Sequence, residues 1–127
     1  MTPLVRGATA LLLMIAAGCK PNATTVQWAK EATGGNPQRG EAALVRYGCI
    51  ACHTVDGIRQ SQAATVGPPL TRMASRTYLA GNLQNTPETL IRWIQKPREI
   101  HPDTAMPDVG VTDSDAQDMA AYLYTFK

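Results

Sequence analysis

The chain has 127 residues, of which 17% are charged and 6% are aromatic, so it can form one small domain with a core that contains few aromatic side chains. Its formal net charge of +2 comes without a basic run, which argues against a nucleic-acid-binding protein. An aliphatic helical core is the simplest interpretation of this composition, although a bound apolar group would also fill the space that aromatic residues leave.

Residues 1–18 have the pattern of an export signal. Arg6 gives a positive start, residues 8–17 are mostly apolar, and small residues follow. The apolar run is about half as long as a bilayer-spanning helix requires. A buried core helix would have a similar composition, but the position at the very N-terminus argues against it. We therefore predict an exported protein on the periplasmic side of a bacterial membrane.

The residues around Cys19 predict how this signal is cleaved. Ala16, Ala17 and Gly18 before Cys19 resemble the lipobox of bacterial lipoproteins, although Leu is usual where Ala16 stands. An ordinary signal peptidase would also accept these small residues. The cysteine count favours lipidation, because two of the three cysteines belong to the motif described below and Cys19 is left as an odd thiol in an oxidising compartment. The mature chain is thus expected to carry a lipid on Cys19 and no transmembrane helix.

Residues 19–36 are polar and end in a Gly-Gly-Asn sequence before Pro37, which predicts a flexible tether. The alternative is a short helix in which Val26, Trp28 and Ala32 face the domain. The domain itself is expected to span residues 37–127.

Three helices are predicted within this domain. Each starts at a capping residue, and in the first two a proline follows the cap. The predicted helices run from Pro37 to Gly48 after Asn36, from Pro87 to Pro97 after Thr86, and from Thr112, which forms a capping pair with Asp115, to Phe126. No alternating strand pattern is present, so the sequence predicts an all-α domain with long loops.

The segment Cys49-Ile50-Ala51-Cys52-His53 is the attachment motif of haem c. Two thiols must reach the two vinyl groups of the porphyrin, and the next His must turn its Nε2 toward the iron, which one tight helical turn achieves. A redox dithiol needs no His at this position, and a zinc site would need a second pair of ligands. We therefore predict one covalent haem c, bound through Cys49 and Cys52, with His53 as an iron ligand.

The second iron ligand is expected to be Met106. This residue lies in a loop bounded by Pro102 and Pro107, which restrains the backbone and can direct one side chain inward. Met73 and Met119 are expected to pack in the core instead. His101 is the alternative ligand, and an exposed loop histidine is its simpler interpretation.

From about Gly40 to Phe126 the chain resembles the class I cytochrome c family. The elements that carry the resemblance occur in the family's order: the helix with Gly40, the Cys49–His53 motif, the turn at residues 67–70, the helix at 89–94, the loop at 102–106 and the helix at 120–123. The resemblance implies about four to five helices with long loops around one haem, and Met106 as the distal ligand. Asp103 stands where the family usually has Gly, and Asp is among the few residues that tolerate a positive φ.

The resemblance also implies roles for three further residues. Pro68 should accept a hydrogen bond from Nδ1–H of His53, which fixes the imidazole tautomer. Trp93 stands where the family often has a Tyr facing the haem, and its indole N–H would donate to a propionate or a neighbouring side chain. Gly40 should let the first helix of the domain cross the last one closely near Tyr122.

With His53 and Met106 both bound, the iron has no open position for a substrate. The predicted function is one-electron transfer, without enzyme activity, to or from a membrane-bound respiratory partner such as a terminal oxidase or a periplasmic dehydrogenase. Two alternatives remain: a haem enzyme or gas-binding protein with an open distal site, and a fixed electron-transfer subunit of a larger redox complex. The Met106–iron bond distinguishes the first alternative, and co-purification the second.

Charge is unevenly distributed along the domain. Residues 39–98 contain eight basic and three acidic side chains, and residues 99–126 contain six acidic and no basic ones. This pattern predicts either a dipolar protein that its electric field orients during docking or a solvated surface without functional meaning.

Overall fold

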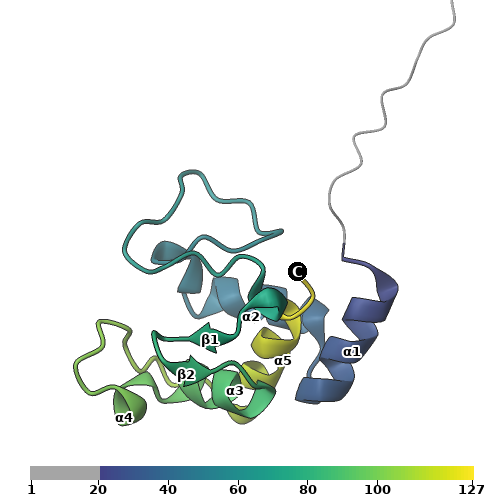
Figure 1. Ribbon diagram of the computed structural model, residues 1–127. Coiled ribbons are helices and arrows are strands. Elements are labelled where there is room, and N and C mark those ends of the chain that lie inside the picture. The colour runs from purple at the N-terminus through teal and green to yellow at the C-terminus, as the bar shows by residue number, and fades with distance from the viewer. Residues whose placement is uncertain (1–20) are drawn as a thin grey trace, which may run out of the picture.

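The computed structural model describes residues 21–127, so the predicted export signal and Cys19 lie outside the described residues. The elements, in chain order, are α1 (Ala23–Thr33), α2 (Pro37–Arg46), the 3-10 turns η1 (Cys49–Ala51) and η2 (Met73–Ser75), strands β1 (Tyr78–Leu79) and β2 (Leu83–Gln84), α3 (Pro87–Gln95), α4 (Pro97–Ile100) and α5 (Asp113–Leu123). The fold is therefore mostly helical, as predicted (Figure 1). None of the helices within residues 21–127 has the length and apolar character needed to cross a membrane.

The predicted helix starts are confirmed. The side chains of Asn36, Thr86 and Thr112 each accept a hydrogen bond from a backbone N–H in the first turn of the helix that follows. These bonds satisfy donors that have no partner inside the helix. The first predicted helix ends at Arg46, and Gly48 then adopts a φ of 74°. The last ends at Leu123, three residues before the predicted end, so Phe126 lies outside it.

Helix α1 corrects the expectation of a flexible tether, and the short helix considered as the alternative is what the structure contains. Asn22 caps its start by accepting a bond from Thr25 N–H, and Gly34 ends it with a φ of 71°. Thr25, Ala29 and Thr33, each four residues apart, form its buried face, and the helix packs mainly against α5. Composition suggested a tether because this face is made of small residues rather than large apolar ones.

The packing of α2 across α5 forms the centre of the domain. A Cβ atom on Gly40 would collide with the backbone carbonyl of Asp118 and with the side chain of Tyr122, so the two helices cross at van der Waals contact there. This confirms the expected role of Gly40, because only Gly permits so close an approach of two backbones. Leu44 and Met119 are completely enclosed beside this crossing.

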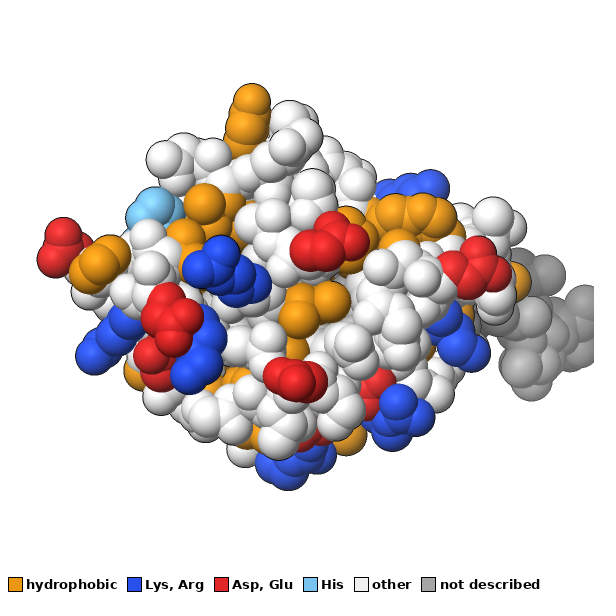
Figure 2. Space-filling view, turned by 90° about the horizontal axis from the view of Figure 1, so that it is seen from below, with side chains coloured by type: hydrophobic (Ala, Val, Ile, Leu, Met, Phe, Trp, Pro, Cys, Tyr) orange, Lys and Arg blue, Asp and Glu red, His pale blue; other side chains and the backbone are white. Residues whose placement is uncertain are grey.

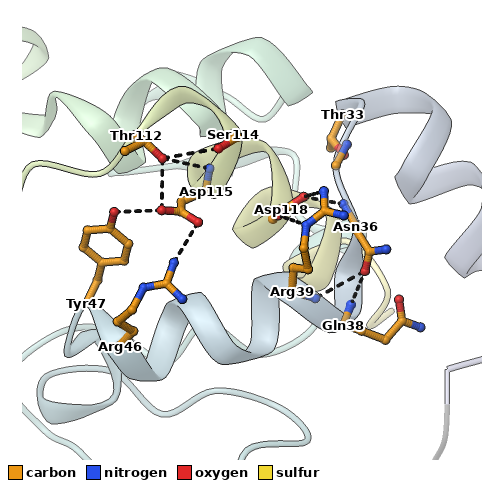
Figure 3. Close-up of polar contacts among 11 residues, drawn as sticks. Thr33, Asn36, Gln38, Arg39, Arg46, Tyr47, Thr112, Ser114, Asp115 and Asp118 are labelled. Atoms are coloured by element: carbon orange, nitrogen blue, oxygen red, sulfur yellow. Dashed lines mark hydrogen bonds and ion pairs between the residues drawn. The ribbon is translucent and has the colours of Figure 1, made fainter.

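Two carboxylates of α5, those of Asp115 and Asp118, form ion pairs with α2 (Figure 3). The buried carboxylate of Asp118 accepts hydrogen bonds from Asn36 N at 2.6 Å and from Arg39 Nε at 2.6 Å and Nη2 at 2.8 Å. Bidentate pairing of this kind is the strong form of an Arg–carboxylate contact. It joins residues that are 79 positions apart in the sequence and fixes where α2 begins along α5.

A small hairpin is the second departure from the sequence prediction, which contained no strand. Strands β1 and β2 pair antiparallel, with Tyr78 opposite Gln84 and Leu79 opposite Leu83. The turn between them places Ala80 and Gly81 at φ values of 47° and 91°. Strands of two residues are too short for the alternating pattern from which strands are predicted.

Candidate functional site

A cavity of about 780 Å³ lies beside the α2–α5 crossing, which is ample room for a large ligand. Its walls come from α2, the Cys–His turn, α3, α5 and the loops at residues 66–70 and 104–111. Most of the lining is apolar, and Leu44, Leu90, Ile94 and Leu123 form its inner part. The loops that line it lie on the left of Figure 1, whereas α1 lies at the right and contributes no lining residue.

The Cys–His motif forms one wall of this cavity. Gly48, in the left-handed region, turns the chain out of α2 into η1, and His53 N then donates to Cys49 O at 3.0 Å. This tight turn brings Cys49, Cys52 and His53 to the cavity together, and both cysteines are free thiols. Burial raises the pKa of the Cys49 thiol, which keeps the sulfur uncharged within the wall.

The loop at residues 67–70 orients the imidazole of His53. Its Nδ1 lies 2.6 Å from Pro68 O, so Nδ1 carries the proton and donates, and Nε2 keeps its lone pair for a metal. Gly67 lies directly against the ring, since a Cβ atom there would collide with three of the ring atoms. Backbone bonds from Gly67 N to Cys52 O and from Leu70 N to Thr54 O, both 2.7 Å, hold the loop in place. The contact expected of Pro68 is thus present in the structure.

Met106 also lines the cavity, from the loop between α4 and α5. Its backbone N–H donates to Thr104 Oγ1 at 3.3 Å, and Thr104 N donates to His101 O at 3.0 Å, so two successive turns shape this loop. His101 lines the same cavity and meets the ring of Trp93 edge to face at a centroid distance of 5.6 Å. Within residues 21–127 its Nε2 is buried and has no hydrogen-bond partner. Both candidate ligands, Met106 and His101, therefore line the cavity.

Met73 and Met119, which were expected to pack, are both buried, with 3% and 0% of their surface exposed. Each borders the cavity but belongs to the apolar cluster that surrounds it. They are therefore part of the wall that the packed helices form.

The sequence model of the cytochrome c family matches residues 37–127 of this chain. The chain belongs to the cytochrome c family. It is 30% identical over 90 residues to cytochrome c oxidase subunit 2 of Alkalihalophilus pseudofirmus and 28% identical over 88 residues to the same subunit of Bacillus subtilis. These matches cover 70% and 68% of this chain but only 25% of each relative, so the chain spans about a quarter of their length.

Solved structures agree on the fold. The structure of cytochrome c2 from Rhodobacter sphaeroides superposes with a TM-score of 0.52 at 24% sequence identity, over 70% of this chain and 94% of that one. The class I cytochrome c fold predicted from the order of the motifs is therefore confirmed, and helix α1 precedes the region that the family model matches.

Membership of this family implies a covalently bound haem c, and the residues present fit that group. The two free thiols and His53 lie in one wall of an apolar cavity, and the bond from Nδ1 to Pro68 leaves Nε2 available for iron.

Gln60 supports the Cys–His turn and was not identified from the sequence. Its Nε2 donates to Ile50 O at 2.8 Å and to His53 O at 2.9 Å, and its Oε1 accepts from Val55 N at 3.2 Å. One amide side chain thus satisfies three backbone groups around the motif. A glutamine in a polar loop has no distinguishing pattern, so no signal in the sequence could have indicated this role.

Among residues 21–127, Arg76 is the only Lys, Arg, Asp or Glu side chain that lines the cavity, and it too was not predicted. Its Nη2 donates to Pro69 O at 2.6 Å and to Thr71 O at 2.8 Å, and its Nε donates to Thr71 O at 3.1 Å. These bonds hold the guanidinium against the loop that follows Pro68 and satisfy much of its donor capacity.

Tyr47, in the cavity wall, belongs to a polar cluster (Figure 3). Tyr47 lines the cavity and donates its hydroxyl to Asp115 Oδ2 at 2.8 Å, while Arg46 Nη2 donates to Asp115 Oδ1 at 2.7 Å. The hydrogen bond from Tyr47, reinforced by those from Thr112 and Arg46, lowers the pKa of the Asp115 carboxyl.

The same pairs change the interpretation of the charge distribution. Arg39 and Arg46, from the basic part of the sequence, form ion pairs with Asp118 and Asp115, from the acidic part. On the face shown in Figure 2, basic and acidic side chains are interspersed rather than gathered at opposite sides. For these residues, basic and acidic side chains that are separated along the sequence therefore lie next to one another in the structure.

Proposed function

We propose that the protein is a one-electron carrier with a single haem c, attached through Cys49 and Cys52 and ligated by His53 and Met106. The observation that supports this most directly is the apolar cavity, whose lining contains both free thiols, the oriented imidazole and the Met106 side chain. The haem would supply an iron that alternates between the ferrous and ferric states without gaining or losing a ligand.

The residues of the chain set the conditions for that exchange. Pro68 and Gly67 hold His53 in one tautomer and one orientation. The apolar lining excludes water and disfavours the additional charge of the ferric state, which raises the reduction potential, and a thioether ligand acts in the same direction. Met106 closes the position at which a substrate or a gas would bind. These features favour a carrier over a haem enzyme or a gas-binding protein.

We further propose that the protein is exported and lipidated at Cys19, on the periplasmic side of a bacterial membrane. Asn22 caps α1, so only three residues, 20–22, separate Cys19 from the folded domain. Three extended residues span about 10 Å. An acylated chain would thus hold the domain close to the membrane surface, within reach of membrane-bound partners.

The partner proposed is a respiratory complex such as a terminal oxidase or a periplasmic dehydrogenase. The relatives named cytochrome c oxidase subunit 2 contain a region similar to this chain as part of a longer polypeptide. That similarity favours electron delivery to an oxidase, and it also supports the alternative that the domain is a fixed electron-transfer subunit of a larger complex.

Haem attachment tests this proposal most directly. The denatured protein should retain its haem and give the pyridine haemochrome spectrum of a c-type haem. Cys52→Ala should lose one thioether bond and yield little stable protein, because a group that binds only the native state contributes to its stability. Ile50→Val, in the same turn, is the matched control and should behave as the unmodified chain. Extraction of all the haem into acidified organic solvent would contradict the proposal.

A further inference from the structure

The loop that follows the Cys–His motif, residues 54–66, has little backbone structure of its own. It contains no helix or strand, and within residues 55–66 the one backbone–backbone hydrogen bond runs from Ile58 N to Val55 O at 3.4 Å. Gln60 is half-buried in this loop, whereas the residues beside it in the segment 59–63 are all exposed. The side chain of Gln60 is therefore the one in this segment that turns toward the domain.

The amide of Gln60 bonds to backbone groups on both sides of its side-chain plane. Its Nε2 donates to Ile50 O at 2.8 Å and to His53 O at 2.9 Å, which uses both of its hydrogens, and its Oε1 accepts from Val55 N at 3.2 Å. Carbonyl oxygens only accept and a backbone N–H only donates, so this orientation of the amide is the one that satisfies all three partners.

Two consecutive peptide units after His53 are held in this way. The first contributes the His53 carbonyl to Gln60, and the second contributes the N–H of Val55. The other end of the second peptide, Thr54 O, accepts a hydrogen bond from Leu70 N at 2.7 Å. Rotation of either peptide unit would therefore break contacts on both sides of it.

The bond from Leu70 connects this arrangement to the ring of His53. Leu70 belongs to the same short loop as Gly67, which packs against the imidazole, and Pro68, whose carbonyl lies 2.6 Å from Nδ1. Gln60 thus acts on His53 by two routes: directly through its backbone carbonyl, and indirectly through the loop that holds its ring.

We propose that Gln60 is a positioning residue for the iron ligand: it fixes the backbone of His53 and the loop of Pro68 relative to each other, and so maintains the Nδ1–H bond that orients the imidazole. This inference rests on the proposed function, because it concerns His53 as a ligand of haem iron. The partner of the second ring nitrogen sets the orientation and the basicity of a ligating histidine. A ring held from both sides keeps its place when the iron changes oxidation state.

Hydrogen exchange in the ferrous haem-loaded protein, followed by NMR, tests the inference. Gln60→Leu removes all three hydrogen bonds at similar side-chain size. The His53 Nδ1–H and the Leu70 N–H should then exchange about tenfold faster than in the unmodified protein, because both belong to the local unit that Gln60 holds. The amides of Leu44 and Met119, at the crossing of α2 and α5, should exchange at unchanged rates.

Gln60→Glu is the second variant and has almost the same shape. Its carboxylate can still accept from Val55 N but cannot donate to the carbonyls of Ile50 and His53, so it should also accelerate exchange of the His53 Nδ1–H. It keeps the test available if Gln60→Leu yields too little protein. Gln62→Leu is the matched control, because Gln62 lies in the same loop but is exposed. It should leave the exchange rates unchanged.

Unchanged exchange of the His53 Nδ1–H in the Gln60 variants would overturn the inference, as would an equal increase in Gln62→Leu. Faster exchange at every amide, those of Leu44 and Met119 included, would also overturn it, because it would show a general contribution to stability rather than positioning of the ring. The haemochrome spectrum is recorded first on the same samples. If the haem is not covalently attached, the proposed function fails; if it is attached and the Gln60 variants have no local effect, only the role of Gln60 is wrong.

Discussion

Gly67 is the residue through which the backbone most directly controls the ring of His53. Its Cα faces the imidazole so closely that no side chain fits between them. Pro68, the next residue, accepts the Nδ1–H bond. The position of the ring is thus determined by the backbone of Gly67 and Pro68. In addition, Gln60 donates a hydrogen bond to the backbone carbonyl of His53. The orientation of His53 therefore depends on this loop as much as on the Cys–His motif.

Gly67→Ala should therefore displace the His53 ring even though it adds one methyl group. We expect a loss of about 1–3 kcal/mol in the free energy of unfolding, because the added methyl group would meet ring atoms of His53 that the hydrogen bond from Nδ1 to Pro68 O holds in place. Chemical denaturation of the holoprotein measures this loss, and the visible spectrum should report altered iron ligation. Gly110→Ala is the control: it has a φ of 72° and open space around it, so roughly 1 kcal/mol of backbone strain should appear without a spectral change.

Met106 decides between a carrier and an enzyme. Met106→Ala should abolish the weak long-wavelength absorption band of ferric haem with a thioether ligand, lower the reduction potential and let the ferrous iron bind carbon monoxide. Met73→Leu, Met119→Leu and His101→Ala should keep the band. Ready binding of carbon monoxide by the unmodified ferrous protein at neutral pH would instead favour a haem enzyme or a gas-binding protein.

At the scale of elements, the domain is organised by the contacts that α5 makes with α2 and α1. Small residues allow both approaches: Gly40 of α2 against Asp118, and Ala29 within the buried face of α1. Trp28 of α1 also meets Tyr124 edge to face at 5.5 Å. Helix α1 is thus a packed part of the domain, although it precedes the region that the family model matches.

Ala29→Glu tests whether α1 is packed in solution. Ala29 is fully buried, so the variant would place an unpaired carboxylate between helices and lower the free energy of unfolding by about 3 kcal/mol or more. Thr24→Glu, on the exposed side of the same helix, should have little effect. Equal stability of both variants would indicate that the segment is detached, as a flexible tether would be.

The Asp115 cluster links α2 to α5 in a pH-dependent manner. The pKa of the Asp115 carboxyl is lowered in the folded state. Between the unfolded-state pKa of about 3.9 and the lower folded-state pKa, the unfolded chain therefore binds more protons than the folded one. The contribution of Asp115 is therefore complete above that unfolded value and is lost as the pH falls through the folded pKa. In denaturation curves recorded from about pH 5 downward, the free energy of unfolding should fall less steeply with pH for Asp115→Asn than for the unmodified protein. Tyr47→Phe should fall between these two.

At the scale of the whole molecule, the sequence predicted the features that adjacent residues specify, but not the contacts between residues far apart in the chain. The helix caps and the Cys–His turn could be predicted because each is specified within a few adjacent residues. The pairing of Arg39 with Asp118 could not, since it joins positions 79 residues apart. The packing of α1 was missed for the same reason. Its buried face consists of small residues, and these can be recognised as a packing face only once α5 is known to lie against them. A haem cavity was implied by the Cys–His motif, but the side chains that line it from distant parts of the chain could be identified only from the fold.

The arrangement of the whole molecule also gives the anchoring proposal a consequence. Helix α1, near the start of the described residues, lies at one edge of the molecule, whereas the loops that line the cavity lie at the opposite edge (Figure 1). A lipid on Cys19, which three residues separate from α1, would therefore attach the domain at the edge opposite these loops. The cavity would then be open to the extramembranous part of a membrane-bound complex.

Three measurements test this anchoring. Mass spectrometry of the mature N-terminus should find an acylated Cys19, and Cys19→Ser should move the haem-loaded protein from the membrane to the soluble fraction, while its visible spectrum is retained because the fold begins after the anchor. A flexible insertion of about 15 residues after Lys20 should leave the protein membrane-bound but increase its r.m.s. reach to roughly 20 Å, which would be seen as faster proteolysis or antibody access near α1. An unmodified mature N-terminus, or membrane binding that persists in Cys19→Ser, would refute lipid attachment at this residue and leave the proposed haem site unaffected.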